Sequence, residues 1–145
     1  MADRTNGEIT IEADQAKIMD VIADLPAYPD WSDGVEAVEV LETTPEGRPD
    51  RARFTFASGP IKDTYVLKYS WHGNDSVDWT LESGGVIKQQ DGTYTLVANP
   101  DGSVTVTYDL TVELSIPMIG MIRKKAEKMI VKTALQGLKD RVDSL

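Results

Sequence analysis

The chain has 145 residues, of which 41% are hydrophobic and 27% are charged, and it carries a net charge of −9 with no cysteine. This length fits one ordinary domain, so we expect a single domain over residues 1–145 with its own core. The negative charge disfavours nucleic acid as a partner, because phosphate binding needs a basic surface. The lack of cysteine excludes disulfides and thiolate metal ligands.

The N-terminal segment, Met1 to Glu8, is polar and lacks the basic-then-apolar order of a secretory signal. No stretch of the sequence approaches the apolar length that spans a bilayer. We therefore expect a cytoplasmic protein.

The first elements are a strand and a short helix. Residues Glu8 to Ala13 alternate, with Ile9 and Ile11 on one side. Asp14 is placed to cap a helix that Pro26 ends. A turn-rich connector follows, up to Gly34.

Six further runs have the pattern of strands. The links between them are of hairpin size, which predicts sequential antiparallel pairing. The run Val86 to Ala98 contains Asp91-Gly92, where we expect a bulge. The six runs are Val35–Thr44, Arg51–Ala57, Ile61–Trp71, Ser76–Glu82, Val86–Ala98 and Val104–Leu114.

The chain ends in a long helix. Pro117 can begin it, and no strong breaker follows, which predicts about 28 residues and a length of roughly 40 Å. Spacing at 100° per residue predicts a covered face that drifts towards Val131, Leu138, Val142 and Leu145 near the end. The residues predicted on that face are Ile119, Ile122, Ala126, Met129, Ile130, Thr133 and Gly137.

The middle of this covered face is small in side-chain volume, at Ala126, Thr133, Ala134 and Gly137. Two interpretations remain open: the small residues interdigitate with large ones of the sheet, or they leave room for a ligand. The large residues expected on the inner face of the sheet are Phe54, Phe56, Tyr65, Leu67, Tyr69, Trp79, Leu81, Tyr94, Leu96 and Tyr108. Buried phenol and indole groups usually have hydrogen-bond partners, and a cavity with water or a polar ligand atom would supply them. This favours the interpretation with room for a ligand.

Two charged features of the helix also have two interpretations each. Arg123 lies at the edge of the covered side. There it either pairs with Glu127 one turn on, or binds the carboxylate or phosphate head group of a ligand. The segment from Arg123 to Leu145 carries +4 and the remainder −13. Its stripe at Lys125, Lys128 and Lys132 is either a solvated helix face or a contact surface for an anionic membrane or protein.

The order of these elements resembles the helix-grip superfamily, and is most similar to its polyketide cyclase/dehydrase group in the short bacterial form. The resemblance spans the whole chain and is carried by structural signatures. These are Ile22–Trp31 (IADLPAYPDW), Val38–Leu41 (VEVL), Tyr69, Trp79 with Leu81, Gly92 with Tyr94, and Pro117 before the lysine-rich helix that includes Leu138-Lys139.

The resemblance implies an α+β helix-grip fold, in which a curved antiparallel sheet wraps around the long C-terminal helix. It also implies a deep cavity between the two, and connector residues Tyr28 and Trp31 that lock onto the sheet edge. It carries no shared catalytic motif.

The sequence contains few candidates for a catalytic acid or base. The one histidine, His72, lies in a turn on the outward side of its strand, and few acidic residues face inward. We therefore assign no catalytic residue, metal or cofactor. The residues predicted to line the ligand site are Phe56, Tyr65, Tyr69, Trp79, Tyr94, Tyr108, Ile122, Arg123, Ala126, Met129, Ile130 and Thr133.

Three functions follow from this pattern. The first is binding of a hydrophobic small molecule, such as a lipid or polyketide, by a carrier or sensor that is a monomer or weak dimer. The second is a polyketide cyclase or aromatase. The third is a protein-interaction or toxin-like module that uses the basic helix face.

Overall fold

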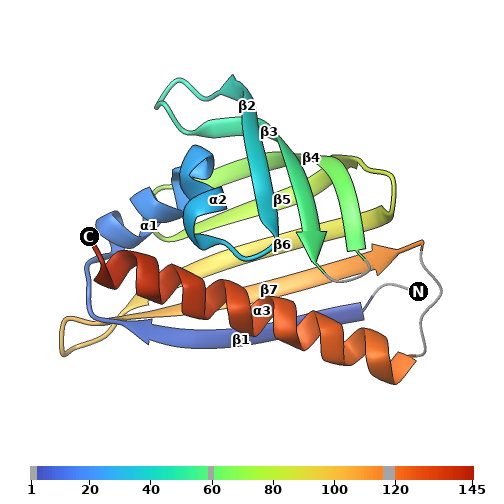
Figure 1. The fold of residues 1–145 in the computed structure, drawn as a ribbon. Helices are drawn as coiled ribbons and strands as arrows, with labels where there is room; N and C mark the ends of the chain where they lie inside the picture. Colours follow the sequence, from blue (N-terminus) through green and yellow to red (C-terminus); the bar gives the residue numbers. More distant parts are fainter. Residues whose placement is uncertain (1–2, 59–60, 116–119) are drawn as a thin grey trace.

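A computed structural model describes residues 3–58, 61–115 and 120–145, apart from the side chains of residues 3, 58, 61, 120–123 and 126. Its elements form one sheet and a set of helices (Figure 1). In chain order they are β1 (Asp3–Ile11), α1 (Gln15–Ala23), the 3-10 turn η1 (Leu25–Ala27), α2 (Tyr28–Trp31), β2 (Val35–Thr43), β3 (Pro49–Ser58), β4 (Ile61–His72), β5 (Ser76–Ser83), β6 (Ile87–Ala98), β7 (Val104–Leu114) and α3 (Gly120–Asp143).

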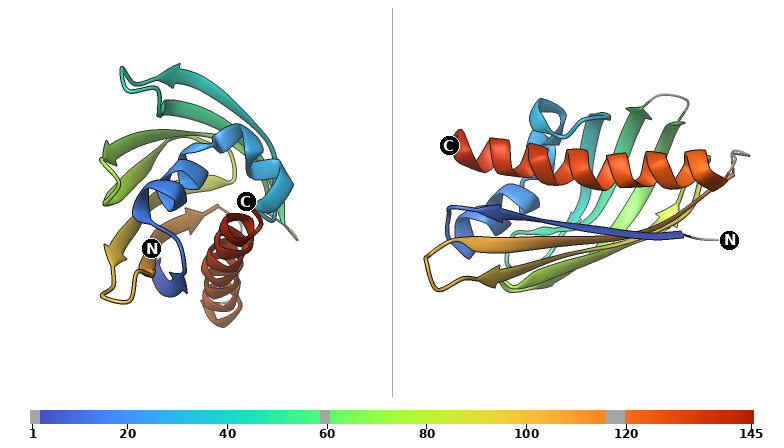
Figure 2. Two further views of the ribbon diagram at one scale, coloured as in Figure 1. Left: turned by 90° about the vertical axis from the view of Figure 1, so that its left-hand side faces the viewer. Right: turned by 90° about the horizontal axis from the view of Figure 1, so that it is seen from below.

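The seven strands pair in the order β1-β7-β6-β5-β4-β3-β2, and every neighbouring pair is antiparallel. Strands β2 to β7 follow one another as hairpins, which confirms the predicted sequential pairing. The first strand returns beside the last, so β1 and β2 form the two edges. The sheet curves, and α1, α2 and α3 lie on its concave side (Figure 2). The predicted α+β helix-grip architecture is confirmed.

Helix α1 and the connector that follows it are stabilised by short-range contacts. Asp14 caps α1, because its side chain accepts a hydrogen bond from the backbone N–H of Lys17 at 2.8 Å. In the connector, the buried Tyr28 donates its hydroxyl proton to the carbonyl of Ile22 at 2.5 Å. Its ring lies 6.3 Å from Phe54 on β3 and 4.8 Å from Trp31. These contacts fasten the connector to the sheet.

Alternation along the strands sends large side chains to the concave face. Strand β7 shows it most regularly, with buried residues at every second position from Val104 to Val112. In β6 the register shift lies between Ile87 and Gln89 rather than near Asp91-Gly92, so the predicted bulge position is wrong. Gly92 sits within the regular ladder opposite Leu110, which keeps Tyr94 and Leu96 on the inner face.

Helix α3 lies along β1 and also contacts β7. A side chain at Gly7 of β1 would meet Val131 at 3.0 Å and Leu135 at 3.3 Å, so these helix residues pack directly on the backbone of β1 there. Among the described side chains of α3, the buried ones are Glu127, Val131, Leu135, Leu138 and Val142. None of the described helices combines the length and apolar composition that a bilayer crossing requires.

The covered face of α3 therefore differs from the predicted one. Helical spacing gives only relative angles, and two neighbouring apolar faces compete; the sheet covers the one that contains Val131 and Leu138. Met129 is 58% exposed, so its predicted place on the covered face is wrong. Ile130 and Ala134 are half-buried and pack against the core. The positions of Pro117 and Ile119 lie outside the described residues.

One of the small helix residues has a plain packing role. A Cβ atom at Gly137 would lie 3.0 Å from the carbonyl oxygen of Trp31 and 3.5 Å from its ring. The small residue thus lets the connector pack against the helix. At Gly137 the interdigitating interpretation holds, and the space belongs to Trp31 rather than to a ligand.

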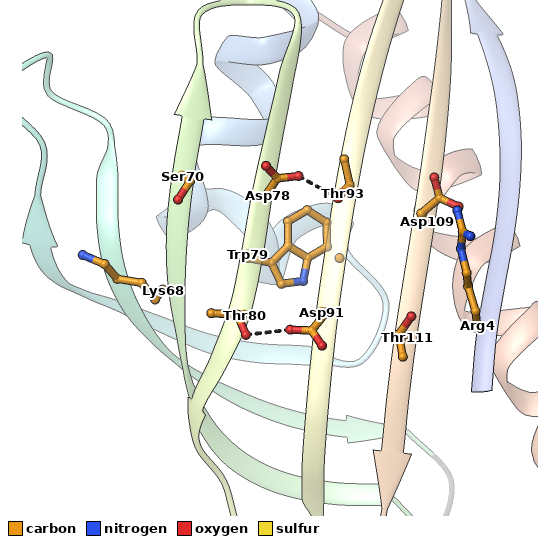
Figure 3. Close-up of a pocket in the computed structure, with 11 residues that line it drawn as sticks. Arg4, Lys68, Ser70, Asp78, Trp79, Thr80, Asp91, Thr93, Asp109 and Thr111 are labelled. Carbon is orange, nitrogen blue, oxygen red and sulfur yellow. Dashed lines mark hydrogen bonds and ion pairs between the residues drawn. The ribbon is translucent and has the colours of Figure 1, made fainter. Parts of the chain in front are cut away.

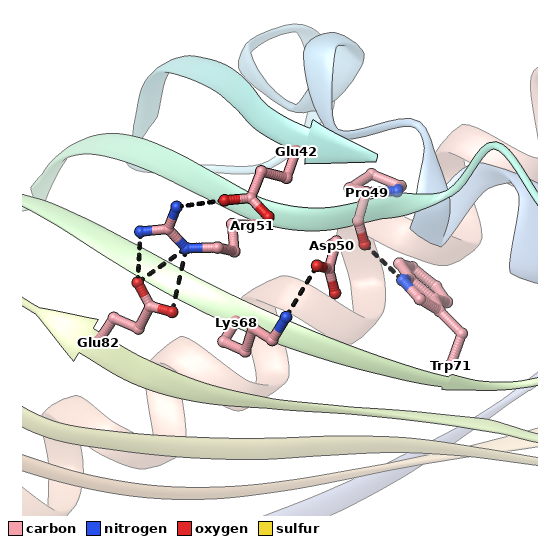
Figure 4. Close-up of polar contacts among 7 residues, drawn as sticks. All are labelled: Glu42, Pro49, Asp50, Arg51, Lys68, Trp71 and Glu82. Atoms are coloured by element: carbon pink, nitrogen blue, oxygen red, sulfur yellow. Dashed lines mark hydrogen bonds and ion pairs between the residues drawn. The ribbon is translucent and has the colours of Figure 1, made fainter. Parts of the chain in front are cut away.

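The convex face of the sheet is polar and crossed by ion pairs (Figure 4). Arg51 holds Glu82 through two nitrogens, at 2.6 Å from Nη2 and 2.9 Å from Nε, and reaches Glu42 at 2.7 Å from Nη1. Lys68 pairs with Asp50 at 2.8 Å. One face of the sheet is therefore wet and the other covered.

Candidate functional site

The concave face carries a belt of aromatic rings that runs from β3 to β7. Trp79 stands at its centre, with ring centroids 6.0 Å from Tyr69, 5.3 Å from Tyr94 and 5.7 Å from Tyr108. Towards β3, the ring of Tyr65 stacks on Phe54 at 5.5 Å and lies 6.5 Å from Phe56. The belt confirms the inward direction predicted for these side chains.

The position of Trp79 depends on a glycine on the neighbouring strand. Trp79 pairs with Gly92 across β5 and β6. A Cβ atom at Gly92 would lie 2.2 Å from Cε2 and Cζ2 of the indole. The indole therefore lies flat against the backbone of β6, where only glycine leaves room for it.

The tyrosines bring unsatisfied polar groups into this apolar face. Among the described residues, the hydroxyls of Tyr65, Tyr69, Tyr94 and Tyr108 have no hydrogen-bond partner, whereas Tyr28 donates to Ile22. The four side chains are at most 7% exposed. Buried phenols are normally hydrogen-bonded, so these four hydroxyls need a partner that the protein itself does not supply.

Burial is the main cause that raises the pKa of each of these four tyrosines. Three of them, Tyr69, Tyr94 and Tyr108, have rings within 6.0 Å of the Trp79 ring. The rings of Tyr94 and Tyr108 lie 4.7 Å apart. These tyrosines therefore share one region of the concave side with the indole.

The indole of Trp79 adds a donor to the same region. Its Nε1 is sealed from solvent and has no hydrogen-bond partner in the described part of the chain. The hydroxyl oxygens of the four tyrosines are not among such sealed atoms, so they border space that water can reach. The concave face thus presents one N–H group and four hydroxyls within an aromatic wall.

Helix α3 lies on the same concave side of the sheet (Figure 2). Ile130 and Thr133 are half-buried, and Phe56 on β3 is half-buried over Gly34. The side chains of Ile122, Arg123 and Ala126 lie outside the described residues, so their predicted place at the site is not tested. Met129 is mostly exposed, and its contact with a ligand stays a prediction.

Glu127 is a residue that the sequence analysis missed. Its side chain is only 2% exposed, on the buried face of α3 one turn before Val131. The signal lay in its spacing: Glu127, Val131, Leu135 and Leu138 recur at intervals of three and four. The sequence analysis considered Glu127 only as one possible partner of Arg123, whose side chain lies outside the described residues.

The outer face has a groove of its own, about 440 Å³ and open to solvent, over β4 to β7 (Figure 3). Its polar groups already hold one another: Thr93 donates to Asp78 at 2.7 Å, and Thr80 donates to Asp91 at 2.6 Å. Arg4 and Asp109 pair at 3.1 Å. A groove whose carboxylates are occupied in this way is a weaker candidate than the concave face.

The remaining chemistry is limited. His72 is exposed, as predicted, with Nε2 2.9 Å from Asp78. In the described part of the chain, no three His, Asp or Glu side chains gather in a way that could hold a metal ion.

The sequence matches a known family. Residues 11–139 match the family described as polyketide cyclase/dehydrase and lipid transport, which is most of the chain. No protein with a curated description matches the sequence.

Solved structures share the fold at low sequence identity. A START superfamily protein from Mycobacterium smegmatis has a TM-score of 0.88 at 20% identity, over 97% of both chains. A protein from Thermus thermophilus has a TM-score of 0.82 at 21% identity, over 98% of both chains. The ZhuI aromatase/cyclase from Streptomyces sp. R1128 has a TM-score of 0.81 at 11% identity, over 99% of this chain and 94% of that one.

Proposed function

The chain belongs to the polyketide cyclase/dehydrase and lipid transport family, and from that premise we propose that it binds a hydrophobic small molecule between the concave face and α3. The ligand carries oxygen atoms, and the protein acts as its carrier or sensor in the cytoplasm. The observation that carries this proposal is the set of four buried tyrosine hydroxyls with no hydrogen-bond partner in the described chain.

The chemistry of the wall sets the ligand class. Aromatic rings supply apolar contact, and hydroxyls with one N–H group supply hydrogen bonds at a few positions, which is the usual composition of a small-molecule site. A pure alkyl chain would leave those groups unsatisfied. A ligand with carbonyl or hydroxyl oxygens would satisfy them.

Binding of two probes of similar size tests this proposal. We expect a polyhydroxylated aromatic probe, such as a flavonol, to bind more tightly than a fluorescent fatty acid. The Tyr94→Phe/Tyr108→Phe double variant should weaken flavonol binding roughly 2- to 10-fold per hydrogen bond lost. It should leave fatty-acid binding unchanged.

Two results would count against the proposal. One is that neither probe binds and no small molecule appears in native mass spectra of the purified protein. The other is equal loss of both probes in the double variant, which would indicate a packing effect rather than loss of hydrogen bonds. A Val97→Ala variant, on the exposed side of β6, serves as the control.

A second candidate, polyketide cyclisation, is supported by the buried Glu127 on the same side of the sheet as the tyrosines. A carboxylate there could take a proton from the carbon between two carbonyls of a poly-β-ketone chain. The resulting carbanion would attack a third carbonyl, and a tyrosine hydroxyl would donate to the alkoxide that forms. If the protein does not accelerate formation of cyclised product over the spontaneous rate, or if Glu127→Gln and Tyr94→Phe leave that rate unchanged, this candidate fails.

A further inference from the structure

The first half of α3 carries a cluster of exposed lysines. Lys124, Lys125, Lys128 and Lys132 are all exposed and lie within nine consecutive residues, a helix length of about 13 Å. In the described part of the chain none of the four forms an ion pair or a hydrogen bond through its side chain. The one acidic residue among them, Glu127, turns to the buried face. We call these four residues the lysine patch.

Several other cations of the protein form ion pairs. Arg51 binds two carboxylates, Arg53 pairs with Glu39, and Lys68 pairs with Asp50. Further along α3, Lys139 pairs with Asp143 at 2.6 Å. The lysine patch therefore differs from the end of its own helix, where the charges are balanced.

An exposed apolar side chain stands within the lysine patch. Met129 is 58% exposed and lies next to Lys128 in sequence and one turn from Lys125 and Lys132. The side chain of Met129 points in nearly the opposite direction to those of Val131 and Leu138, so it faces away from the sheet. A flexible apolar side chain among cations is a pattern found on helices that lie at membrane surfaces.

From the charge and shape of this surface we propose that the lysine patch docks the protein on an anionic lipid membrane, with Met129 entering the headgroup layer. The segment from Arg123 to Leu145 carries +4 while the rest of the chain carries −13. Charges beyond about 8–10 Å are screened at physiological ionic strength, so the membrane senses mainly the patch.

The form of the patch favours a membrane over a protein partner. Lys125 and Lys132 lie on the outward side of the helix, with Lys128 and Lys124 towards its flank, and no neighbouring group in the described chain fixes any of the four side chains. Such a row suits a diffuse layer of lipid phosphates, whereas a specific protein contact usually has fixed, directional groups. If the protein is the carrier proposed above, α3 also borders the proposed ligand site, so docking through this helix would bring that site to the membrane.

Vesicle flotation tests the proposal with the whole chain. We expect the protein to bind vesicles with about 30% phosphatidylglycerol at about 50 mM salt, and to release at about 0.5 M salt. It should not bind vesicles of phosphatidylcholine alone. The Lys125→Gln/Lys132→Gln variant should lower the partition coefficient about 25-fold, because each lysine near an anionic surface contributes roughly a factor of five.

A matched variant controls for total charge. Lys62→Gln/Lys88→Gln removes two exposed lysines from the sheet and changes the net charge by the same amount. Its partition coefficient should stay within about twofold of the wild type, allowing for screened long-range repulsion. Met129→Ser should lower binding about threefold or more by removing the apolar contact.

Several results would overturn the proposal. They are no binding of the wild type to anionic vesicles, an equal loss in the two double variants, or unchanged binding of Met129→Ser. A concentration-dependent dimer in sedimentation, dissolved by Lys125→Gln/Lys132→Gln while vesicles are not bound, would assign the patch to a second copy. Flavonol binding is measured separately, without vesicles. If the protein binds flavonol but not anionic vesicles, the membrane inference fails and the proposed function does not.

Discussion

Substitution of Gly92 by alanine tests whether the aromatic belt is organised as the structure shows it. The added Cβ would lie 2.2 Å from two atoms of the Trp79 indole and 2.6 Å from its Nε1. Ordinary carbon contacts are about 3.5–4.0 Å, so the indole would have to move by roughly 1.5 Å. The rings of Tyr94 and Tyr108, with centroids 5.3 Å and 5.7 Å from that of the indole, resist that movement.

The expected cost is about 1–3 kcal/mol of unfolding free energy, the usual range for an overpacked core. The φ angle of Gly92 is not positive, so an alanine is compatible with its backbone and the cost comes from the collision. The smaller entropy of the unfolded alanine chain offsets a few tenths of this amount. In urea the transition midpoint should fall by roughly 0.5–1 M with an unchanged slope.

A double-mutant cycle separates the collision from other effects. In a Trp79→Leu background the branched side chain is shorter, and Gly92→Ala should cost less than about 0.5 kcal/mol. Val97→Ala on the exposed side of the same strand should also stay within about 0.5 kcal/mol. An equal cost of Gly92→Ala in both backgrounds would falsify the assignment of the collision to Trp79.

Three further predictions follow from the same contacts. Burial raises the pKa of all five tyrosines, so above about pH 10 the unfolded state loses phenolic protons that the folded state keeps, and stability falls as pH rises. Absorbance at 295 nm should show the phenolates in one step together with the loss of circular dichroism; early, gradual ionisation would contradict this. Tyr28→Phe should cost about 1–3 kcal/mol in urea unfolding, because it leaves the buried carbonyl of Ile22 without its partner, whereas Tyr94→Phe should cost under about 0.5 kcal/mol. Asp14→Ala should cost about 1 kcal/mol through the lost cap of α1, and a midpoint equal to that of the wild type would exclude the capping role.

Much of the fold could be read from local patterns. Alternation located six strands to within two residues at each end, because one face of the sheet is buried and the other is wet. Asp14 marked the start of α1, whereas the helix ends at Ala23 and Pro26 lies within the 3-10 turn that follows. The extension of β1 back to Asp3 was not expected, since Arg4 to Gly7 lacks an apolar pattern; its backbone pairs with β7 all the same.

The candidate site was predicted in part. Tyr65, Tyr69, Trp79, Tyr94 and Tyr108 could be placed on one face by strand parity alone. Parity could not reveal that their hydroxyls would lack partners, because that depends on which groups the curvature of the sheet brings near them.

The long terminal helix shows the same division. Its existence, its lysine stripe and its amphipathic character follow from the spacing of its residues, which is a local property. Its orientation does not: Glu127 and Val131 face the sheet and Met129 faces outward because the helix packs at Gly7, where β1 has no side chain in the way. Local spacing thus specifies which elements form and which residues share a face. The choice of the face of α3 that is covered is made in three dimensions, because close approach depends on the shapes of two surfaces that are far apart in the chain.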